Sequence, residues 1–162
     1  HSAQQTLAIT NPDCMVRRLP RLDGQALLDA VANADVVLDC SDNFTTRYAL
    51  NRACIALKKP LVSGAAIKLT GQLFVMDPRQ SGAPCYACLY PEEAQDEELR
   101  CATTGILAPV TGVIGCMQAV EAIKFITGFG QPATGLLQRY DALTGRWHTS
   151  NVCRDPLCTC HH

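Results

Sequence analysis

The sequence predicts an α/β fold built on a mostly parallel sheet with crossover helices. Residues 35–40 and 60–66 are short apolar runs, which are typical of strands buried on both faces of a sheet. Between them, residues 44–57 have the length and composition of a helix, which Pro60 prevents from continuing. This β-α-β order indicates a Rossmann-like arrangement.

The composition is that of one soluble domain. The chain has 162 residues, of which 48% are hydrophobic and 18% are charged, and its net charge is -1. We therefore expect a single domain over residues 1–162 that binds neither nucleic acid nor membranes. Residues 106–126 are apolar but include Gln118, Glu121 and Lys124, which argues against a membrane span. The polar start forms no signal peptide, so we expect a cytoplasmic protein.

The elements of the first half follow from periodicity and from helix stop signals. The strands before residue 77 are expected to span residues 15–19, 35–40, 60–66 and 69–76. A further helix is expected over residues 23–34, whose apolar residues recur at helical spacing. Ser41 or Asp42 is expected to cap the helix over residues 44–57.

The second half begins with a long loop punctuated by prolines, over residues 77–105. Pro109 then opens a long helix that ends at Gly128, because proline suits the first helical turn and glycine suits the position after the last. A C-terminal hairpin follows, whose two strands are expected over residues 136–143 and 147–153.

Two close pairs of cysteines lie far apart in the sequence: Cys85 with Cys88, and Cys158 with Cys160. A structural zinc ion needs four ligands in tetrahedral geometry, and each pair can bring two thiolates to one ion. His161 follows Cys158 by three residues and also suits zinc, so the fourth ligand is either Cys160 or His161. The alternative is disulfide or redox chemistry at Cys85 and Cys88.

We expect three segments in the second half of the chain. These are a zinc-stapled crossover loop at 84–107, the long helix at 108–128, and the hairpin with a zinc-binding tail at 135–162. Four other cysteines stand in apolar runs and are expected as reduced core residues, namely Cys14, Cys40, Cys54 and Cys116. Reduced thiols again favour the cytoplasm.

The run from Asp39 to Asn43 leaves a buried strand and enters a helix, at the edge where such sheets bind ligands. Asp42 can hold Mg²⁺ that bridges phosphates, or it can simply cap the helix. Arg47 stands one turn into that helix, where a surface ion pair is expected rather than a catalytic role.

Cys101 is the candidate nucleophile. It follows Arg100, and a neighbouring cation lowers the pKa of a thiol. It also lies in a polar stretch, where a thiol can reach a substrate. The alternatives are an inert loop thiol or a spare zinc ligand.

These features occur together in one known family, in the same order and over nearly the whole chain. The matching segments are NPD at 11–13, VLDCSDN at 37–43, PLVSGAA at 60–66, GQL at 71–73, PCYACL at 84–89, GVIG at 112–115, QAVEAIK at 118–124 and DPLC at 155–158. On these motifs the chain resembles the ThiF/MoeB/HesA family, the bacterial relatives of ubiquitin-activating enzymes.

The resemblance implies an ATP-dependent adenylyltransferase that acts on the C-terminal glycine of a ubiquitin-like sulfur-carrier protein, either ThiS-like or MoaD-like. It implies sulfur transfer for thiamin or molybdopterin synthesis, and a homodimer. Carried over by position, Asp42 is the aspartate of the Mg-ATP site and Asn43 belongs to the same nucleotide contact. Cys101 matches the cysteine that takes up the activated glycine in the ThiF branch.

The resemblance also implies that Cys85, Cys88 and Cys158 are zinc ligands. The family's fourth zinc cysteine falls at His161, so this chain departs from the family pattern there.

No glycine-rich phosphate loop precedes Asp39 in this chain. The resemblance therefore implies the C-terminal portion of the enzyme, which by itself lacks most of the ATP site. A rival interpretation is a non-catalytic, zinc-stabilised module that binds a ubiquitin-like protein. A third is a thiol–disulfide oxidoreductase that uses Cys85 and Cys88, which the proline-punctuated loop around them disfavours.

Overall fold

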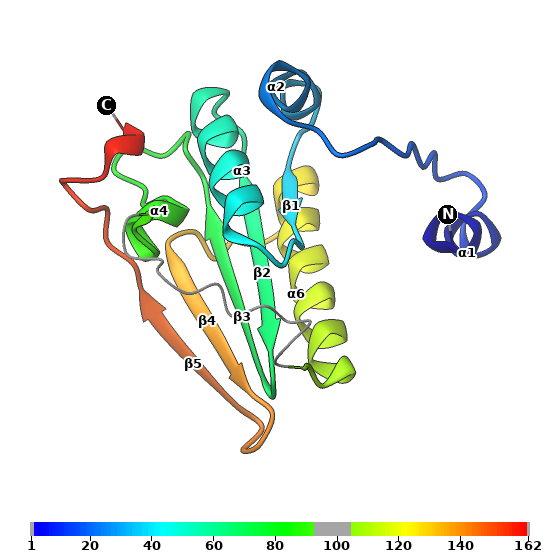
Figure 1. The fold of residues 1–162 in the computed structure, drawn as a ribbon. Coiled ribbons are helices and arrows are strands. Elements are labelled where there is room, and N and C mark those ends of the chain that lie inside the picture. Colours follow the sequence, from blue (N-terminus) through cyan, green and yellow to red (C-terminus); the bar gives the residue numbers. More distant parts are fainter. Residues whose placement is uncertain (1, 93–104, 162) are drawn as a thin grey trace.

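The computed structural model describes residues 2–92 and 105–161, apart from the side chain of His161. In this part of the chain, a five-stranded sheet is covered by helices on both faces (Figure 1). In the order in which they lie across the sheet, the strands are β1 (Val37–Asp39), β2 (Leu61–Ile67), β3 (Thr70–Met76), β4 (Leu136–Asp141) and β5 (Arg146–Asn151). The helices are α1 (Ser2–Thr10), α2 (Gly24–Ala32), α3 (Phe44–Ala56), α4 (Tyr86–Leu89), α6 (Ala108–Thr127) and the 3₁₀ turn η2 (Thr159–His161).

The prediction of a mostly parallel sheet is wrong. Among the described strands only β1 and β2 run parallel, with Asp39 opposite Ser63, and the other three neighbouring pairs are antiparallel. Only Lys68 and Leu69 separate β2 from β3, which is too short for a crossover connection and makes the two strands a hairpin. Both strands are largely buried, so their apolar character does not reveal their direction.

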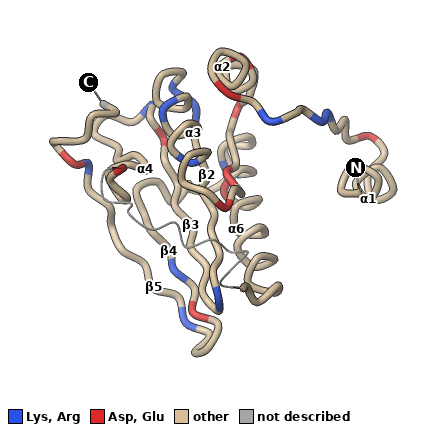
Figure 2. Tube along the Cα trace, viewed as in Figure 1, with Lys and Arg blue, Asp and Glu red and all other residues tan. Residues whose placement is uncertain are grey.

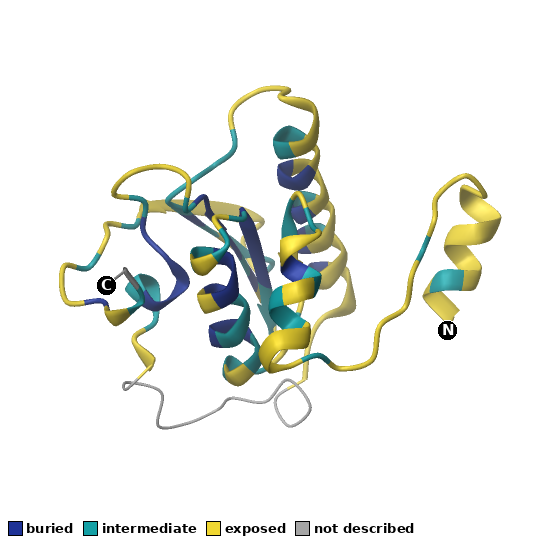
Figure 3. Ribbon diagram, turned by 90° about the horizontal axis from the view of Figure 1, so that it is seen from above, coloured by how far each residue is buried: buried dark blue, intermediate teal, exposed yellow. Residues whose placement is uncertain are grey.

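The core is divided between the two faces of the sheet. Leu61 and Phe74 belong to the cluster beneath α3 and α4, whereas their neighbours Val62 and Val75 belong to the cluster beneath α6. Successive residues of a strand point to opposite faces, which explains this alternation. Figure 3 shows the buried residues of α3 on the side that faces the strands.

Most of the predicted helices are confirmed, with boundaries that differ by a few residues. The helices expected at 23–34, at 44–57 and from Pro109 onwards are α2, α3 and α6, and the C-terminal hairpin is β4 with β5. The strand expected at residues 15–19 is wrong, since these residues have no regular structure. In its described part, the loop predicted at residues 77–105 contains the helical turn α4. Helix α1 has no buried residue and lies apart from the sheet (Figure 1).

The cysteines expected in the core are mostly exposed. Of the four, Cys54 is buried, and its burial raises the pKa of its thiol to about 12. Cys14, Cys40 and Cys116 are exposed. Cys116 illustrates the reason, because α6 is apolar around much of its circumference but contacts the sheet along one side only. None of the nine cysteines that the structure describes forms a disulfide.

Helix α6 is long and apolar enough to cross a membrane by length and composition alone. It nevertheless packs along the sheet, with the polar Gln118 and Glu121 on its buried side. Lys124 donates to Glu121 over 2.7 Å, so this buried carboxylate is paired. A Cβ atom on Gly71 would lie 2.5 Å from Ile114, so the missing side chain lets helix and sheet approach closely. Figure 2 shows acidic and basic residues dispersed over the described chain, in keeping with the small net charge.

Candidate functional site

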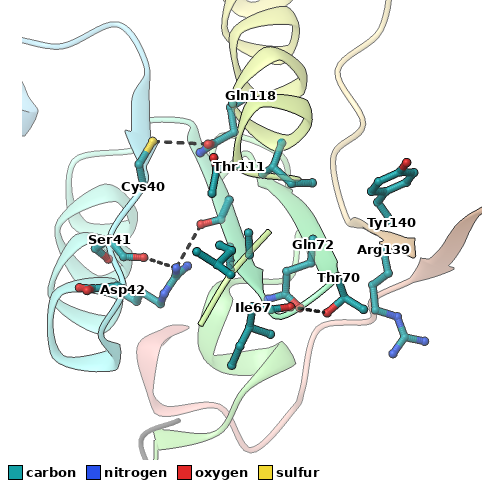
Figure 4. A pocket seen from close by; sticks show the side chains of 18 of the residues that line it. Cys40, Ser41, Asp42, Ile67, Thr70, Gln72, Thr111, Gln118, Arg139 and Tyr140 are labelled. Carbon is teal, nitrogen blue, oxygen red and sulfur yellow. Dashed lines mark hydrogen bonds between the residues drawn. The ribbon is translucent and has the colours of Figure 1, made fainter. Parts of the chain in front are cut away.

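A cavity of about 880 Å³ opens at the carboxyl ends of β1 and β2 (Figure 4). Its walls come from the β1–α3 turn, the second half of β2, the start of β3, helix α6 and the hairpin of β4 and β5. In α/β sheets, ligands bind outside the carboxyl ends of the strands, which makes this cavity the candidate site.

A buried carboxylate organises the edge of this cavity. Asp39 ends β1 with 1% of its surface exposed, and its Oδ1 accepts hydrogen bonds from the Ser41 backbone N (2.9 Å) and Oγ (2.6 Å). Its Oδ2 accepts from Ser63 Oγ at 3.0 Å and from Arg47 Nη1 at 3.1 Å. A buried charge is costly unless it is paired and hydrogen-bonded, and here both conditions are met.

The expectation of a surface ion pair at Arg47 is wrong. The side chain is 5% exposed, and besides Asp39 its guanidinium donates to the carbonyl oxygens of Ser41 and Gly64, the latter at 3.1 Å. Its planar fork thus ties the β1–α3 turn to the neighbouring strand β2. Arg47 is eight positions beyond Asp39, a spacing at which no sequence pattern indicates a contact.

The helix cap leaves Asp42 available to the cavity. Neither Ser41 nor Asp42 caps α3, because Asn43 does so: its Oδ1 accepts from the Thr46 backbone N at 2.9 Å. Asn43 Nδ2 donates to Asp42 Oδ1 at 3.3 Å, and Asp42 is exposed and lines the cavity. An exposed carboxylate with unused acceptor positions can bind a hard cation.

Gln118 of α6 closes the opposite side of the β1 end. Its Nε2 donates to the carbonyl oxygens of Asp39 (2.9 Å) and Val62 (3.0 Å), and its Oε1 accepts from Cys40 Sγ at 3.4 Å (Figure 4). Partial burial raises the pKa of the Cys40 thiol, and the bond to Gln118 opposes this only in part. The sequence analysis used Gln118 as a polar residue in an apolar run and as part of a family motif, and assigned it no role at the site. Its long-range partners lack a sequence signal.

The far wall of the cavity carries charged and aromatic side chains. Arg139 and His148 reach it from the two strands of the hairpin, across the cavity from Asp42 (Figure 4 labels Arg139). Tyr90 donates its hydroxyl to Gln72 Oε1 at 2.8 Å, which links the loop after α4 to β3. Asp141 lines the same wall, so this side of the cavity carries both basic and acidic groups.

A cluster of sulfurs lies at the other end of α3. The Sγ atoms of Cys85, Cys88 and Cys158 lie within 4.8 Å of one another, at 3.7 Å for Cys85–Cys88 and 3.6 Å for Cys85–Cys158. Four thiolates around one ion, each about 2.3 Å from it, would stand about 3.8 Å apart, so the cluster fits a tetrahedral metal. The Cys160 thiol interacts with both Cys158 and Cys85.

Burial raises the pKa of the Cys85 thiol, and it also raises that of Cys160. Both groups therefore stay protonated at neutral pH unless a cation stabilises their thiolates. This behaviour disfavours a redox role, for which a low thiol pKa is required. The donor set of three or four sulfurs suits zinc or another soft metal ion.

The structure thus brings Cys85 and Cys88 together with Cys158, from two segments that lie far apart in the sequence, and it places Asp42 and Asn43 at the cavity. The side chain of His161 and the whole of Cys101 lie outside the described residues. Sequence reasoning missed the buried partners of Asp39 and also Asn51 of α3, which contacts the sulfur cluster.

Comparisons with known proteins identify the family to which the chain belongs. The ThiF family profile matches residues 1–161. The chain is 45% identical over 157 residues to the sulfur carrier protein ThiS adenylyltransferase of Escherichia coli (strain K12), covering 96% of this chain and 61% of that protein. It is 43% identical over 161 residues to the molybdopterin-synthase adenylyltransferase of the same organism, covering 97% and 63%. The chain thus spans about three-fifths of the length of these relatives.

A more distant likeness concerns the fold alone. The crystal structure of E. coli MccB with ATP superposes with a TM-score of 0.76 at 20% sequence identity, covering 98% of this chain and 48% of that one. At this identity the match establishes the shared α/β architecture.

Proposed function

The chain belongs to the ThiF family, and from that premise we propose that the whole protein uses ATP to adenylylate the C-terminal glycine of a ubiquitin-like sulfur-carrier protein. The activated glycine would then accept sulfur for thiamin or molybdopterin synthesis. The names of the two E. coli relatives support this reaction class and this substrate class. A carboxylate is a poor acyl donor, and joining it to AMP supplies a leaving group.

The observation that carries the proposal is the exposed Asp42 carboxylate at the cavity. Asn43 provides the helix cap, so Asp42 is not needed to stabilise α3. Mg²⁺ in proteins is held by one or two carboxylates together with phosphate oxygens. Asp42, with Asn43 beside it, would hold Mg-ATP at this point, where the metal would neutralise charge on the phosphates.

The rest of the cavity suits the tail of the carrier protein. Its floor on β2 is lined by the small residues Gly64, Ala65 and Ala66, over which an extended glycine-ended tail can approach the backbone. Arg139 and His148 on the far wall would attract the terminal carboxylate. Which carrier is served, the ThiS type or the MoaD type, is left to experiment.

The sulfur cluster would hold a structural zinc ion. Cys85, Cys88 and Cys158 supply three thiolates whose separations fit tetrahedral zinc. We propose Cys160 rather than His161 as the fourth ligand, because its thiol interacts with two of the other three. The zinc would join the turn at α4 to the C-terminal turn η2, and both of these turns contact α3.

Cys101 is proposed as the acceptor of the activated glycine, in which case its thiolate would displace AMP and form a thioester. The described residues on either side of the segment 93–104 include Tyr90 and Ile106, which both line the cavity. The match of Cys101 to the acceptor cysteine of the ThiF branch supports this role.

The function is tested by pyrophosphate exchange in the full-length protein, with ATP, Mg²⁺ and purified carrier proteins of both types. Wild-type protein should catalyse exchange with one of them. Asp42→Asn should lower the rate at least about 100-fold, since it removes the charge that holds the metal. Asp29→Asn, an exposed aspartate on α2, is the matched control and should retain the wild-type rate. Carrier binding without exchange in the wild type would favour the non-catalytic module instead.

The role of Cys101 is tested separately. Cys101→Ser should leave pyrophosphate exchange intact, because adenylate formation needs only ATP, Mg²⁺ and the carrier tail. It should abolish a covalent adduct between enzyme and carrier, detected by mass spectrometry under non-reducing conditions. Thiocarboxylate production at the wild-type rate in this variant would make the thiol incidental.

Two further proposals concern the assembly and its surroundings. A homodimer is supported by the apolar residues exposed on α6, among them Ile123 at 51% and Ile126 at 64% exposure, and light scattering would measure it. A reducing cytoplasm is supported by the described cysteines, none of which forms a disulfide. We also propose residues 1–162 as one domain.

A further inference from the structure

Asn51 has a fully buried side chain, with 0% of its surface exposed, on the face of α3 that looks toward the sulfur cluster. Its Oδ1 accepts a hydrogen bond from the Tyr86 backbone N at 2.9 Å. Its Nδ2 lies 3.7 Å from Cys85 Sγ and 3.6 Å from Cys160 Sγ. These three partners of Asn51 all belong to the turns that carry the cysteines.

The orientation of this amide follows from its partners. The Tyr86 backbone N can only donate, so it must face the amide oxygen, and the two N–H groups then point to the two sulfurs. The amide has two N–H donors, and two sulfur atoms lie within their reach. A neutral thiol is a weak acceptor, whereas hydrogen bonds to an ionised acceptor are about twice as strong.

A buried amide whose N–H groups met only neutral thiols would be poorly compensated. The same amide beside two metal-bound thiolates would be well compensated, because it would place positive N–H dipoles against negative sulfur. Partners of this kind around a metal orient its ligands and tune its affinity. The arrangement of Asn51 is therefore one that a charged sulfur cluster explains.

We infer that Asn51 is a positioning residue of the metal centre: it donates N–H···S hydrogen bonds to the thiolates of Cys85 and Cys160, and it fixes the Cys85–Cys88 turn through the Tyr86 backbone. The inference rests on the proposed zinc site. It adds a residue from α3 to a site whose ligands come from two other segments.

The same helix face gives the residue a second consequence. Asn43, Arg47 and Asn51 follow one another at four-residue spacing, which places them on one side of α3. The first two contact the cavity edge, and the ring of Tyr86 lies 5.8 Å from the Arg47 guanidinium. Asn51 therefore fastens the metal-binding turn to the helix that also carries the cavity edge.

The test uses the full-length protein, in which the metal content of the wild type is measured first. Asn51→Asp keeps the oxygen that accepts from Tyr86 but replaces the N–H donors by a second acceptor facing the sulfurs. It should speed zinc release to a chelator by about 10- to 100-fold, the range found when partners of metal ligands are removed. With Co²⁺ in place of zinc, it should also shift the sulfur-to-cobalt charge-transfer absorption, which a purely structural role would leave unchanged.

Asn43→Asp is the matched control. It makes the same chemical change on the same helix face, keeps the capping oxygen and lies at the cavity rather than at the sulfurs, so release rate and spectrum should stay at wild-type values. Asn51→Ala repeats the comparison without an added charge, should the aspartate variant fail to fold. Wild-type release and spectra in both Asn51 variants would overturn the inference while leaving the zinc site standing. A wild type without bound metal would overturn the zinc site and this inference together, leaving the adenylyltransferase proposal to the exchange assay.

Discussion

Polar sites lie at both ends of α3, and they differ in where the positive charge that balances them can come from. At its start, the buried Asp39 carboxylate is neutralised by Arg47, a residue of the chain itself, within a network of hydrogen bonds. Two turns later, α3 contacts a cluster of cysteines, and Arg52 on this part of the helix is exposed and paired with Glu92 at 2.8 Å. The zinc ion that we propose would balance the negative charge of those sulfurs when they are thiolates.

This difference separates what each end can do. A network whose charges cancel within the chain fixes the edge of the cavity and leaves the exposed Asp42 carboxylate for the Mg²⁺ that we propose it holds. A sulfur cluster that needs a cation makes the local structure depend on metal and on pH, because protons compete for thiolates. Substitutions at the two ends should accordingly respond differently to chelation.

Metal loss should have the largest effect, since the binding free energy of structural zinc is folding free energy, about 10–16 kcal/mol in zinc-finger peptides. Cys88→Ser should release zinc and lower the free energy of unfolding by several kcal/mol, and chelation of the wild type should act alike. Thermal melting with and without chelator measures both. Cys54→Ala is the control: this buried thiol lies outside the cluster, and its loss should cost about 1 kcal/mol. A melting temperature that chelator does not change would contradict the proposal that the structure around the cysteine cluster depends on a metal ion.

Breaking the buried ion pair should have the next largest effect. Arg47→Met leaves the Asp39 carboxylate buried without its cation and should cost about 3–5 kcal/mol in urea unfolding, with zinc content unchanged. Arg52→Met on the same helix removes an exposed ion pair and should cost about 1 kcal/mol or less. Equal costs for the two arginines would show that burial does not distinguish these pairs.

A smaller effect is expected where β2 meets α6. A Cβ atom at Gly64 would lie 2.4 Å from the Gln118 carboxamide, so Gly64→Ala should displace that amide from Asp39 and Val62 and cost about 1–3 kcal/mol. Gly115→Ala, on α6 with no atom within 4 Å of its new Cβ, should instead stabilise by up to about 1 kcal/mol. Chemical denaturation measures the sign of each change, and two changes of equal sign would contradict the packing described here.

The smallest effect concerns the helix cap. Asn43→Ala removes the acceptor for the Thr46 backbone N and should cost about 1 kcal/mol. Asp42→Ala should change stability by less than about 0.5 kcal/mol, because the side chain is exposed and does not cap the helix. Urea unfolding of the two variants separates the residue that holds α3 from the residue proposed to hold Mg²⁺. A larger loss at Asp42 than at Asn43 would reverse that division.

Several features of the fold and the site were predictable because they depend on a few residues that are neighbours in the sequence. Pro109 in the first turn and Gly128 after the last turn mark the ends of α6. The spacing of Cys85 and Cys88 predicts one half of a candidate metal site. The family motifs predicted the family, which the matches to known adenylyltransferases confirm. Patterns of this kind depend on local backbone preferences and on side-chain chemistry, and neither requires knowledge of what lies across the core.

What the tertiary structure decided was the pairing of distant groups. The direction of β3 followed from a turn of two residues rather than from the apolar runs, which look alike in buried strands of either direction. Arg47 donates hydrogen bonds to Ser63 and Gly64 on the neighbouring strand. Gln118 bonds residues almost 80 positions away, and Asn51 bonds Cys160. These contacts exist because packing brings buried polar atoms together and each must then find a partner, a requirement that acts on the folded chain and leaves no local pattern in the sequence.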